Sequence, residues 1–358
     1  MPTRPRGANK EMRLALTRVA PGEPLRDGID RVVRAETGAL LVLDDGAEVL
    51  AICSGGFLVD APFSPQRLSE LAKMDGAIII STDGDRIARA NVHLVPDPTV
   101  PTSETGTRHR TAERVARSLR VPVISISEEM GVINVYAGGS KHPLQDISRL
   151  LGRANQALQT LERYKVRLDD SIANLTALEL EDIVSLRDVA QVVQRGEMVH
   201  RIAAEIKIMI IELGIDARLL RLQLDEIYGE LDDELDLVVA DYIPPGHSAN
   251  TVLDELATLA DDDIVDVRRT SAVMRRTASA VDPDQEIAPK GLRLLHRVHR
   301  LPPDVAIRIA DHFGELTKLQ RATADDLAMI EGVDPDMAAA IKDTLERVTE
   351  TTILDQYS

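Results

Sequence analysis

Two short polar segments of this chain contain residue types that could act on phosphate groups. The first is Asp75-Gly76-Ala77, which lies directly before the apolar run IIIS. The second is a basic, hydroxyl-rich stretch at the expected start of a helix: Thr107, Arg108, His109, Arg110 and Thr111. A helix start presents unpaired N–H groups and partial positive charge, and arginine adds bidentate recognition of phosphate oxygens. A nearby carboxylate could hold a divalent metal or orient a hydroxyl nucleophile, so the two segments together indicate phosphoryl chemistry.

Each segment alone also has an ordinary structural interpretation. An Asp-Gly pair is most often a turn, and an arginine-rich helix start is usually a solvated surface. The chain has no G-x-x-x-x-G-K-[ST] stretch, which disfavours a P-loop ATPase, and Gly55-Gly56 lacks the spacing of a dinucleotide-binding loop. The choice between these interpretations depends on whether the fold brings the two segments together.

The elements around both segments predict an α/β domain over residues 1–145. Short apolar runs bounded by Gly, Asp and Pro are typical of buried strands. They are ALLVLDD (39–45), VLAICSGGF (49–57), GAIIIST (76–82) and VPVISIS (121–127), with INVYAGG (133–139) as a further strand before GGSKHP breaks the pattern. Helical spacing is expected for 64–74, with Ser64 as the N-cap before Pro65, and for 110–120.

Two helical regions follow this domain. Residues 146–285 begin with a long amphipathic pattern without proline and predict a helical spine. Residues 286–358 have Gly or Pro breaks about every dozen residues and predict a compact bundle of short helices. The expected architecture is an α/β nucleotide-binding domain, an all-α spine and a small helix-hairpin-helix domain.

Composition limits the partners of the chain. A formal net charge of −17 over 358 residues argues against general, charge-driven binding to nucleic acid or to an anionic membrane. Cys53 is the single cysteine, which excludes an intramolecular disulfide and fits a reducing compartment. No apolar run resembles a signal peptide or a membrane span, so we expect a cytoplasmic protein. The histidines that lack metal-ligand spacing are interpreted as structural or surface residues: His93, His142, His200, His247 and His312.

Together, the two polar segments resemble the paired signature of the diadenylate cyclase domain. KMDGAIIIS is followed about thirty residues later by GTRHRTAER, and SGGF (54–57) and NVHLVPDP (91–98) are similar to the same family. The order of the three regions, and RANQALQTLERYKVRLDD in the second, resembles the DisA family of bacterial DNA integrity scanning proteins. The resemblance covers essentially the whole chain.

This resemblance implies an enzyme that condenses two ATP into cyclic di-AMP and two pyrophosphates, with Mg²⁺ or Mn²⁺ as cofactor. It implies that Asp75 lies beside the ribose 3′-hydroxyl and helps to deprotonate it or to hold the metal. Gly76 and Ala77 would shape the nucleoside pocket, and Leu94 would lie along the adenine. The residues that would hold or support the phosphates are Thr107, Arg108, His109, Arg110, Thr111 and Ser127.

The reaction also implies an assembly. Each ATP must attack the α-phosphorus of the other, so two protomers must face one another, and the family forms homo-octamers built from such pairs. The sequence departs from many relatives after Ser127, where Glu128-Glu129-Met130 brings two carboxylates close to the expected polyphosphate. These carboxylates would oppose binding unless a metal or arginines compensate, or unless they face solvent.

The third region resembles a tandem of helix-hairpin-helix units, at 301–314 and 327–345, which implies binding to branched or damaged DNA. Nine Lys and Arg against thirteen Asp and Glu over 286–358 do not form the basic surface expected of a DNA-binding module. Asp334 stands where the second hairpin would have a glycine, and we expect it to repel phosphate and to resist a positive φ. The expected DNA contacts are Gly332 and an arginine stripe formed by Arg293, Arg297 and Arg300, although a solvated cationic helix explains the stripe as well.

Three hypotheses follow, in order of preference. The first is a metal-dependent diadenylate cyclase regulated by DNA. The second is a nucleotide-binding, DNA-scanning or scaffolding protein with weak or lost turnover, which Glu128-Glu129 would favour. The third is a structural oligomer without a DNA role, which Asp334 and the acidic third region would favour.

Overall fold

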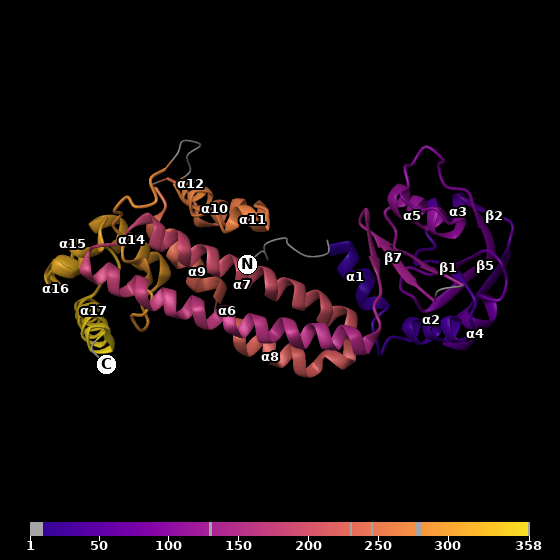
Figure 1. The fold of residues 1–358 in the computed structure, drawn as a ribbon, viewed down its shortest axis with the longest axis horizontal. Helices are drawn as coiled ribbons and strands as arrows, with labels where there is room; N and C mark the ends of the chain where they lie inside the picture. Colours follow the sequence, from indigo (N-terminus) through magenta and orange to yellow (C-terminus); the bar gives the residue numbers. More distant parts are fainter. Residues whose placement is uncertain (1–9, 129–130, 230, 245, 276–280, 357–358) are drawn as a thin grey trace. The chain divides into compact units, whose positions relative to one another are not determined.

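The computed structural model describes residues 10–128, 131–229, 231–244, 246–275 and 281–356 (Figure 1). The chain divides into two compact units. One holds Pro5–Leu158 with Ala204–Leu224, and the other holds Gln159–Ala203 with Asp225–Ser358. These units cut across the two long middle helices, so the three-domain division 1–145, 146–285 and 286–358 stays a prediction.

The first unit is built on an eight-stranded mixed sheet. Its strands are β1 (Ala39–Val42), β2 (Cys53–Ser54), β3 (Phe57–Pro62), β4 (Ala77–Ile80), β5 (Arg86–Leu94), β6 (Val123–Ile126), β7 (Ile133–Ala137) and β8 (Ser140–Pro143). The order is β2-β5-β4-β1-β6-β7-β8, with β3 also paired to β5. β1 and β4 run parallel, and the other neighbouring pairs are antiparallel.

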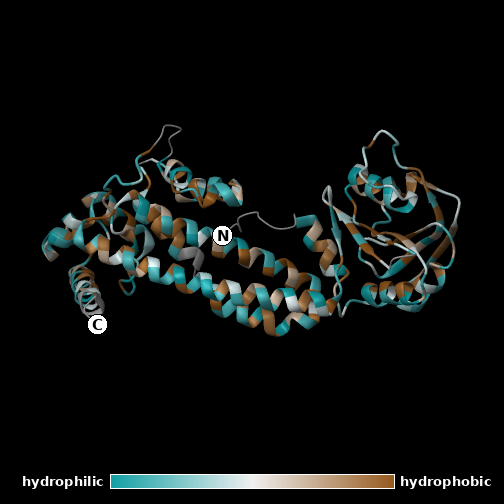
Figure 2. Cartoon of the chain, viewed as in Figure 1, coloured by the Kyte–Doolittle hydropathy of each residue, from teal (hydrophilic) through white to brown (hydrophobic). Residues whose placement is uncertain are grey.

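Helices cover both faces of this sheet, which explains why its central strands are apolar throughout. The helices are α1 (Lys10–Arg18), α2 (Pro24–Arg34), α3 (Ala47–Ala51), α4 (Pro65–Leu71) and α5 (Thr107–Leu119). Leu41 and Ile78 pack with α1, α2 and α4, whereas Leu40 and Ile79 pack with α3 and α5 on the opposite face. In Figure 2 the central strands are accordingly brown, and the surrounding helices carry teal residues on their outer sides. The predicted α/β class is confirmed.

Several local predictions are confirmed and others are wrong. Ser64 caps α4 by accepting a hydrogen bond from the Arg67 N–H at 3.2 Å, as predicted. The run 49–57 is not one strand, because its first half completes α3 before β2 and β3 begin. GGSKHP does not end the sheet, because Gly138 and Gly139, with φ of 55° and 75°, form the turn into β8. The long strand β5 contains several polar residues and was not predicted.

The middle region is helical, as predicted, but it is not one continuous helix. Its elements are α6 (Ile147–Glu181), α7 (Leu186–Leu213), η1 (Gly214–Ala217), α8 (Arg218–Tyr228), α9 (Leu231–Tyr242), α10 (Ala249–Thr258), α11 (Asp261–Ile264) and α12 (Val267–Met274). Asp182 ends α6 with a φ of 59°, and Asp188 then accepts hydrogen bonds from the backbone and hydroxyl of Ser185 at the start of α7. None of the described helices combines the length and apolarity needed to cross a bilayer.

Short helices form the C-terminal part of the second unit, as predicted: α13 (Leu292–Leu295), α14 (Pro303–Phe313), α15 (Leu316–Arg321), α16 (Ala324–Ala328) and the longer α17 (Pro335–Gln356). They share one aliphatic core that includes Leu295, Ile309, Leu327 and Ile341. The core is built from aliphatic side chains because the sequence contains few aromatic residues.

The predicted arginine stripe is wrong for Arg293. α13 ends at Leu295, so no helix continues to Arg300, and the Arg293 side chain is only 2% exposed. Arg293 pairs with the buried Glu179 and donates to the Thr176 hydroxyl at 2.9 Å. Asp241 accepts from the backbone N–H of Arg293 at 3.0 Å, so buried polar groups join α6, α9 and α13. Arg293 is therefore a structural cation and does not face DNA.

We predict that Glu179→Ala lowers the free energy of unfolding by about 3–5 kcal/mol, because it leaves the Arg293 guanidinium buried without its counter-ion. The matched control is Asp304→Ala, which removes an exposed partner of Arg308 and costs less than about 1 kcal/mol. Urea denaturation followed by circular dichroism measures both. Equal losses in the two variants would contradict the structural role of the buried pair.

Candidate active site

Five residues lie in register across one end of the sheet. Val92 pairs with Ala77, Ala77 with Leu40, Leu40 with Ser125, and Ser125 with Asn134. β1 and β4 run in one direction, and β5 and β6 run in the opposite direction. The starts of β1 and β4 therefore lie at the same edge of the sheet as the ends of β5 and β6. Asp75 lies two residues before β4 and Ser127 immediately follows β6, so strand register brings these distant residues to the same edge.

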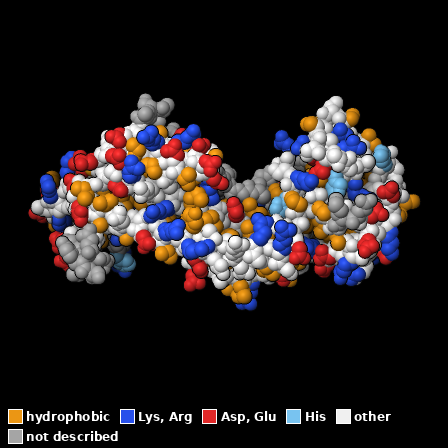
Figure 3. Space-filling view, in the orientation of Figure 1, with side chains coloured by type: hydrophobic (Ala, Val, Ile, Leu, Met, Phe, Trp, Pro, Cys, Tyr) orange, Lys and Arg blue, Asp and Glu red, His pale blue; other side chains and the backbone are white. Residues whose placement is uncertain are grey.

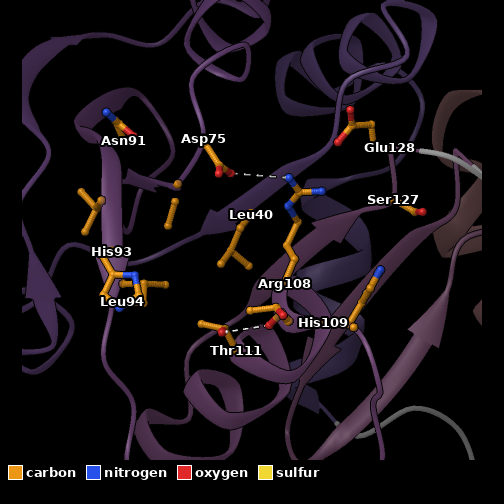
Figure 4. A pocket seen from close by; sticks show the side chains of 15 residues that line it. Leu40, Asp75, Asn91, His93, Leu94, Arg108, His109, Thr111, Ser127 and Glu128 are labelled. Atoms are coloured by element: carbon orange, nitrogen blue, oxygen red, sulfur yellow. Dashed lines mark hydrogen bonds and ion pairs between the residues drawn. The ribbon is translucent and has the colours of Figure 1, made fainter.

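A cavity of about 830 Å³ lies over this row. Its lining residues are Leu40, Asp75, Gly76, Ala77, Asn91, Val92, His93, Leu94, Gly106, Thr107, Arg108, His109, Thr111, Ser127 and Glu128. Figure 4 shows Asp75 and Arg108 pointing toward one another across it. Every residue predicted for the catalytic and nucleotide sites lines this cavity except Arg110, which is exposed on α5. The roles of these residues stay predictions.

The start of α5 is open to an anion. Gly106 is its N-cap and has no side chain that could bind the first N–H groups of the helix. The preceding loop is tied to the body of α5, because Arg114 donates to the Val100 carbonyl at 3.0 Å and buried Glu113 accepts from the Ser103 N–H at 3.0 Å. These contacts hold the loop that ends at Gly106, so α5 begins at the cavity with free N–H groups and partial positive charge.

Arg108 extends from α5 to the opposite wall of the cavity. Its Nη2 lies 3.9 Å from Oδ1 of Asp75, and its Nη1 lies 3.5 Å from the Ile126 carbonyl oxygen. The guanidinium passes directly over Gly38, where an added Cβ would lie 2.0 Å from Arg108 Nη1. Gly38 is buried and does not have a positive φ, so the space for Arg108 is what requires glycine there. Gly38 was not predicted as a site residue, because a glycine before a strand carries no clear signal of this role.

His109 is held by three polar side chains behind the cavity. Its Nδ1 lies 2.7 Å from Ser125 Oγ, 3.3 Å from Tyr136 Oη and 3.4 Å from Asn134 Nδ2. These contacts fix the ring and leave Nε2 as the nitrogen that can reach a ligand. Burial lowers the pKa of His109, with Lys141 and Arg108 adding to the effect, although Glu104 opposes it.

Tyr136 connects His109 to Glu104. The phenol donates to Glu104 Oε1 at 3.1 Å, and Lys141 forms an ion pair with the same oxygen at 2.6 Å. Burial alone would raise the pKa of Glu104, but the hydrogen bonds from Lys141 and Tyr136 outweigh it and lower the pKa. Burial, with the charge and hydrogen bond of Glu104, raises the pKa of Tyr136. The phenol therefore stays protonated, and its oxygen can accept from His109.

Gly76 is required by the neighbouring strand. Its φ is 121°, and an added Cβ would lie 2.8 Å from the backbone carbon of Asn91. The close approach that Gly76 permits in this structure is that of the neighbouring backbone at Asn91. Asn91 itself has a φ of 54°, so both residues bend the chain where β4 and β5 meet the cavity.

Some lining residues were not predicted. Leu40 was placed in a buried strand, Val92 was given no role, and His93 was assigned to structural or surface residues, whereas all three line the cavity. Alternation along β5 would place His93 on the face opposite Val92 and Leu94, so no local pattern indicates that it lines the cavity. Glu128 is exposed at the cavity, whereas Glu129 lies outside the described residues.

The donors at the cavity fit a hard divalent cation. Asp75 and Glu128 supply carboxylate oxygens, and His109 supplies an imidazole. Within the described ranges no three His, Cys, Asp or Glu side chains cluster as a complete metal site. Proteins usually bind Mg²⁺ through one or two carboxylates, and substrate phosphates and waters supply the other ligands. The residues present therefore suit a metal that arrives with a nucleotide.

The C-terminal helices contain two similar hairpins, at 298–303 and 330–335. In the first, the Leu301 N–H donates to the Val298 carbonyl, and in the second the Val333 N–H donates to the Ile330 carbonyl. Arg300 and Gly332 occupy the same place and have positive φ of 63° and 92°. The first hairpin therefore presents a cation at the position where the second has glycine.

The expectation that Asp334 occupies a positive-φ position is wrong. Asp334 is the residue before α17, and its Oδ1 accepts a hydrogen bond from the Met337 N–H at 2.7 Å, which makes it a helix cap. Arg308 lies against the same hairpin, donates to the Glu331 carbonyl at 3.2 Å and pairs with Asp304. On the face shown in Figure 3, acidic and basic side chains are mixed over the helical unit rather than separated into single-sign areas.

Three models of known protein families match successive parts of the chain. Residues 26–141 match the DisA bacterial checkpoint controller nucleotide-binding family, 144–280 match its linker region, and 303–354 match the helix-hairpin-helix motif. The DNA integrity scanning protein DisA of Frankia casuarinae is 50% identical over 348 residues, covering 96% of this chain and 97% of the relative. The protein of the same name from Kineococcus radiotolerans is 48% identical, over 98% of this chain and 99% of its own length. The one from Streptomyces coelicolor is 46% identical, over 98% of this chain and 95% of its own length.

We predict that Gly38→Ala weakens binding of ATP by about tenfold to a hundredfold, because the methyl group displaces the Arg108 guanidinium and its charged hydrogen bonds. Isothermal titration calorimetry measures this loss. Gly152→Ala is the control, because nothing lies within 4 Å of its added Cβ. A Gly38→Ala protein that keeps both its Tm and its affinity for ATP would show that the glycine does not serve Arg108.

Proposed function

This chain belongs to the DisA family of bacterial DNA integrity scanning proteins, and on that premise we propose that it is a diadenylate cyclase. It condenses two ATP into cyclic di-AMP and releases two pyrophosphates. The observation that carries the proposal is one cavity with Asp75 opposite Arg108, at 3.9 Å, beside the uncapped start of α5. Because its proposed ligands are ATP and chromosomal DNA, we propose that the protein acts in the cytoplasm.

The cavity walls suggest how ATP is held. Leu40, Val92 and Leu94 offer an apolar floor for the adenine. Opposite them, the free N–H groups of α5 and the side chains of Arg108 and His109 suit the triphosphate. Ser127 follows β6 at the same wall and would hold a phosphate oxygen, while Thr107 and Thr111 would line the phosphate path on α5. Arg110, which points away from the cavity, would support the phosphates only indirectly.

Asp75 is the residue best placed for the bond-forming step. The ribose 3′-oxygen of one ATP bonds to the α-phosphorus of the other, the bond from that phosphorus to the pyrophosphate oxygen breaks, and the 3′-hydroxyl proton leaves. The Asp75 carboxylate would orient that hydroxyl and accept its proton, while Arg108 and the α5 start stabilise the charge on the departing pyrophosphate. Alignment and charge neutralisation supply most of the catalysis in such transfers.

Mg²⁺ or Mn²⁺ is the proposed cofactor. Asp75, and Glu128 at the opposite wall, would hold the ion together with the triphosphate. When bound, the ion neutralises negative charge on the phosphate oxygens. The exposed carboxylate of Glu128 would then bind the metal instead of repelling the polyphosphate, which would remove the main reason to favour a scaffold with weak turnover.

Two protomers must complete the site. One cavity holds one ATP, and ring closure requires a second ATP presented in the opposite orientation. We therefore propose face-to-face pairs assembled into a homo-octamer. Exposed apolar residues on consecutive turns of the middle helices, Ile215, Leu219 and Leu222, are 71%, 72% and 57% exposed and would suit contacts between such pairs.

We propose that the helix-hairpin-helix region binds branched DNA mainly through its first hairpin. Arg297 and Arg300 are exposed there, with His296 and His299 beside them. The second hairpin has Glu331 and Asp334 exposed, so Gly332 would contribute at most backbone N–H groups. This asymmetry explains how a region of net acidic charge could still hold DNA, and it disfavours a purely structural oligomer.

We predict that Asp75→Asn lowers formation of cyclic di-AMP by about 10²–10⁴-fold, the usual contribution of a positioned acid or base. Arg108→Ala lowers it by about 10²–10³-fold, because it removes a charge that stabilises the departing pyrophosphate. Arg110→Ala is the matched control, since it removes the same charge two residues away outside the cavity, and it causes a much smaller loss. Chromatography of reactions with ATP and Mg²⁺ or Mn²⁺ measures the product.

Size-exclusion chromatography accompanies these assays so that only intact oligomers are compared. The cyclase proposal fails if the folded oligomer forms no cyclic di-AMP with either metal. The assigned geometry fails if Arg110→Ala is as damaging as Arg108→Ala.

For the DNA contact we predict that Arg300→Gly weakens binding to a four-way junction and reduces the slope of log K against log salt concentration by about 0.9, the loss of one phosphate contact. Glycine is chosen because residue 300 has a φ of 63°, which glycine adopts without strain. Fluorescence anisotropy over a range of salt concentrations measures both quantities. An unchanged affinity and slope would remove the first hairpin from the DNA interface.

A further inference from the structure

A second cavity, of about 500 Å³, lies between α6, the turn after α13, and α17 in the helical unit. Its walls are Ala173, Asn174, Thr176, Ala177, Arg297, Arg347, Val348, Thr351 and Thr352. It is separate from the cavity that contains Asp75, and the proposed cyclase activity does not use it. It brings two arginines from distant parts of the sequence to one place.

Neither arginine has an ion-pair partner among the described side chains, unlike Arg293 and Arg308 in the same unit. Asp343 and Glu350 lie one turn to either side of Arg347 on α17, and no ion pair joins either of them to it. Burial lowers the pKa of Arg297, and the charge of Arg293 lowers it further, whereas Glu234 and Glu179 oppose the shift. An anion in the cavity would therefore supply the direct ion-pair partner that neither arginine has among the described side chains.

Among the other polar groups of the cavity, the amide of Asn174 suits an anion. Thr351 and Thr352 donate their hydroxyls to the carbonyls of the preceding turn, at 2.9 Å each, so the hydroxyls are occupied. The amide of Asn174, which is exposed, has no partner in the part of the chain that the structure describes and could donate beside the two guanidinium groups. Two arginines and an amide are typical donors to phosphate oxygens.

Continuity with the first hairpin indicates which anion binds. Arg297 lies only three residues before Arg300 and belongs to the same segment that leads into the hairpin. A duplex held at Arg300 would thus have its backbone close to the opening that Arg297 shares with α17. A backbone phosphate fits this place better than a free nucleotide, because the walls contain no aromatic ring that could stack on a base.

We propose that the groove between α6 and α17 binds a backbone phosphate of DNA through Arg297, Arg347 and Asn174. This extends the DNA surface beyond the hairpin to the helical spine, and it rests on the proposed binding of branched DNA. The spine would then contact DNA directly and would not only carry the hairpin region.

Arg347→Ala tests the proposal, with Arg321→Ala as matched control because Arg321 is exposed on α15 and does not line the groove. On a four-way junction at moderate salt, we expect Arg347→Ala to weaken binding about tenfold and to reduce the salt slope by about 0.9, and Arg321→Ala to change neither appreciably. Asn174→Ala should weaken binding without reducing the slope. Tm and cyclase activity check that each variant is folded and assembled.

Equal affinities and slopes for Arg347→Ala and Arg321→Ala would overturn the proposal. If Arg300→Gly weakens binding while Arg347→Ala does not, the groove is wrong and the hairpin contact stands. If the wild type itself shows no saturable binding to the junction, the DNA function itself fails. A free anion is the alternative occupant of the groove. In that case inorganic phosphate would raise the Tm of the wild type but not that of Arg347→Ala, and Arg347→Ala would bind DNA as the wild type does. That result would contradict a DNA contact.

Discussion

The register of β5, β4, β1, β6 and β7 is the constraint on which the site depends. It aligns Val92, Ala77, Leu40, Ser125 and Asn134 in one row. The first three form the floor of the cavity, and the last two hold His109 from behind. A shift of one residue in any strand would turn its side chains to the other face of the sheet, so the same pairing that buries the core also sets the site.

The arginines of this chain differ in whether the fold gives their side chains an ion-pair or hydrogen-bond partner. Arg293 is neutralised by Glu179 in the interior, and Arg114 holds a loop through a backbone carbonyl. Arg108 has only a distant carboxylate across the cavity, and Arg297 and Arg347 have none among the residues that the structure describes. In a protein with a formal charge of −17, cations without partners mark the places where an anionic ligand can bind.

Much of this could be predicted from sequence, for physical reasons that differ between elements. β1, β4 and β6 are buried on both faces and appear as unbroken apolar runs, and the Arg-His-Arg stretch lies at a helix start because Gly106 precedes it. α3 was mistaken for a strand because its short apolar run, 49–52, has no helical period long enough to recognise. Gly38, His93 and the burial of Arg293 depend on contacts between residues far apart in sequence, which no local pattern contains.

The central claim is that ring closure needs two intact cavities facing one another. Wild-type chains and Asp75→Asn chains, co-expressed in known ratios and purified as mixed oligomers, test it directly. If pairs form at random and each pair needs two intact sites, cyclic di-AMP formation falls as the square of the wild-type fraction, to about one quarter at equal amounts. A linear fall, to about one half, would mean that one protomer closes the ring by itself and would contradict the account.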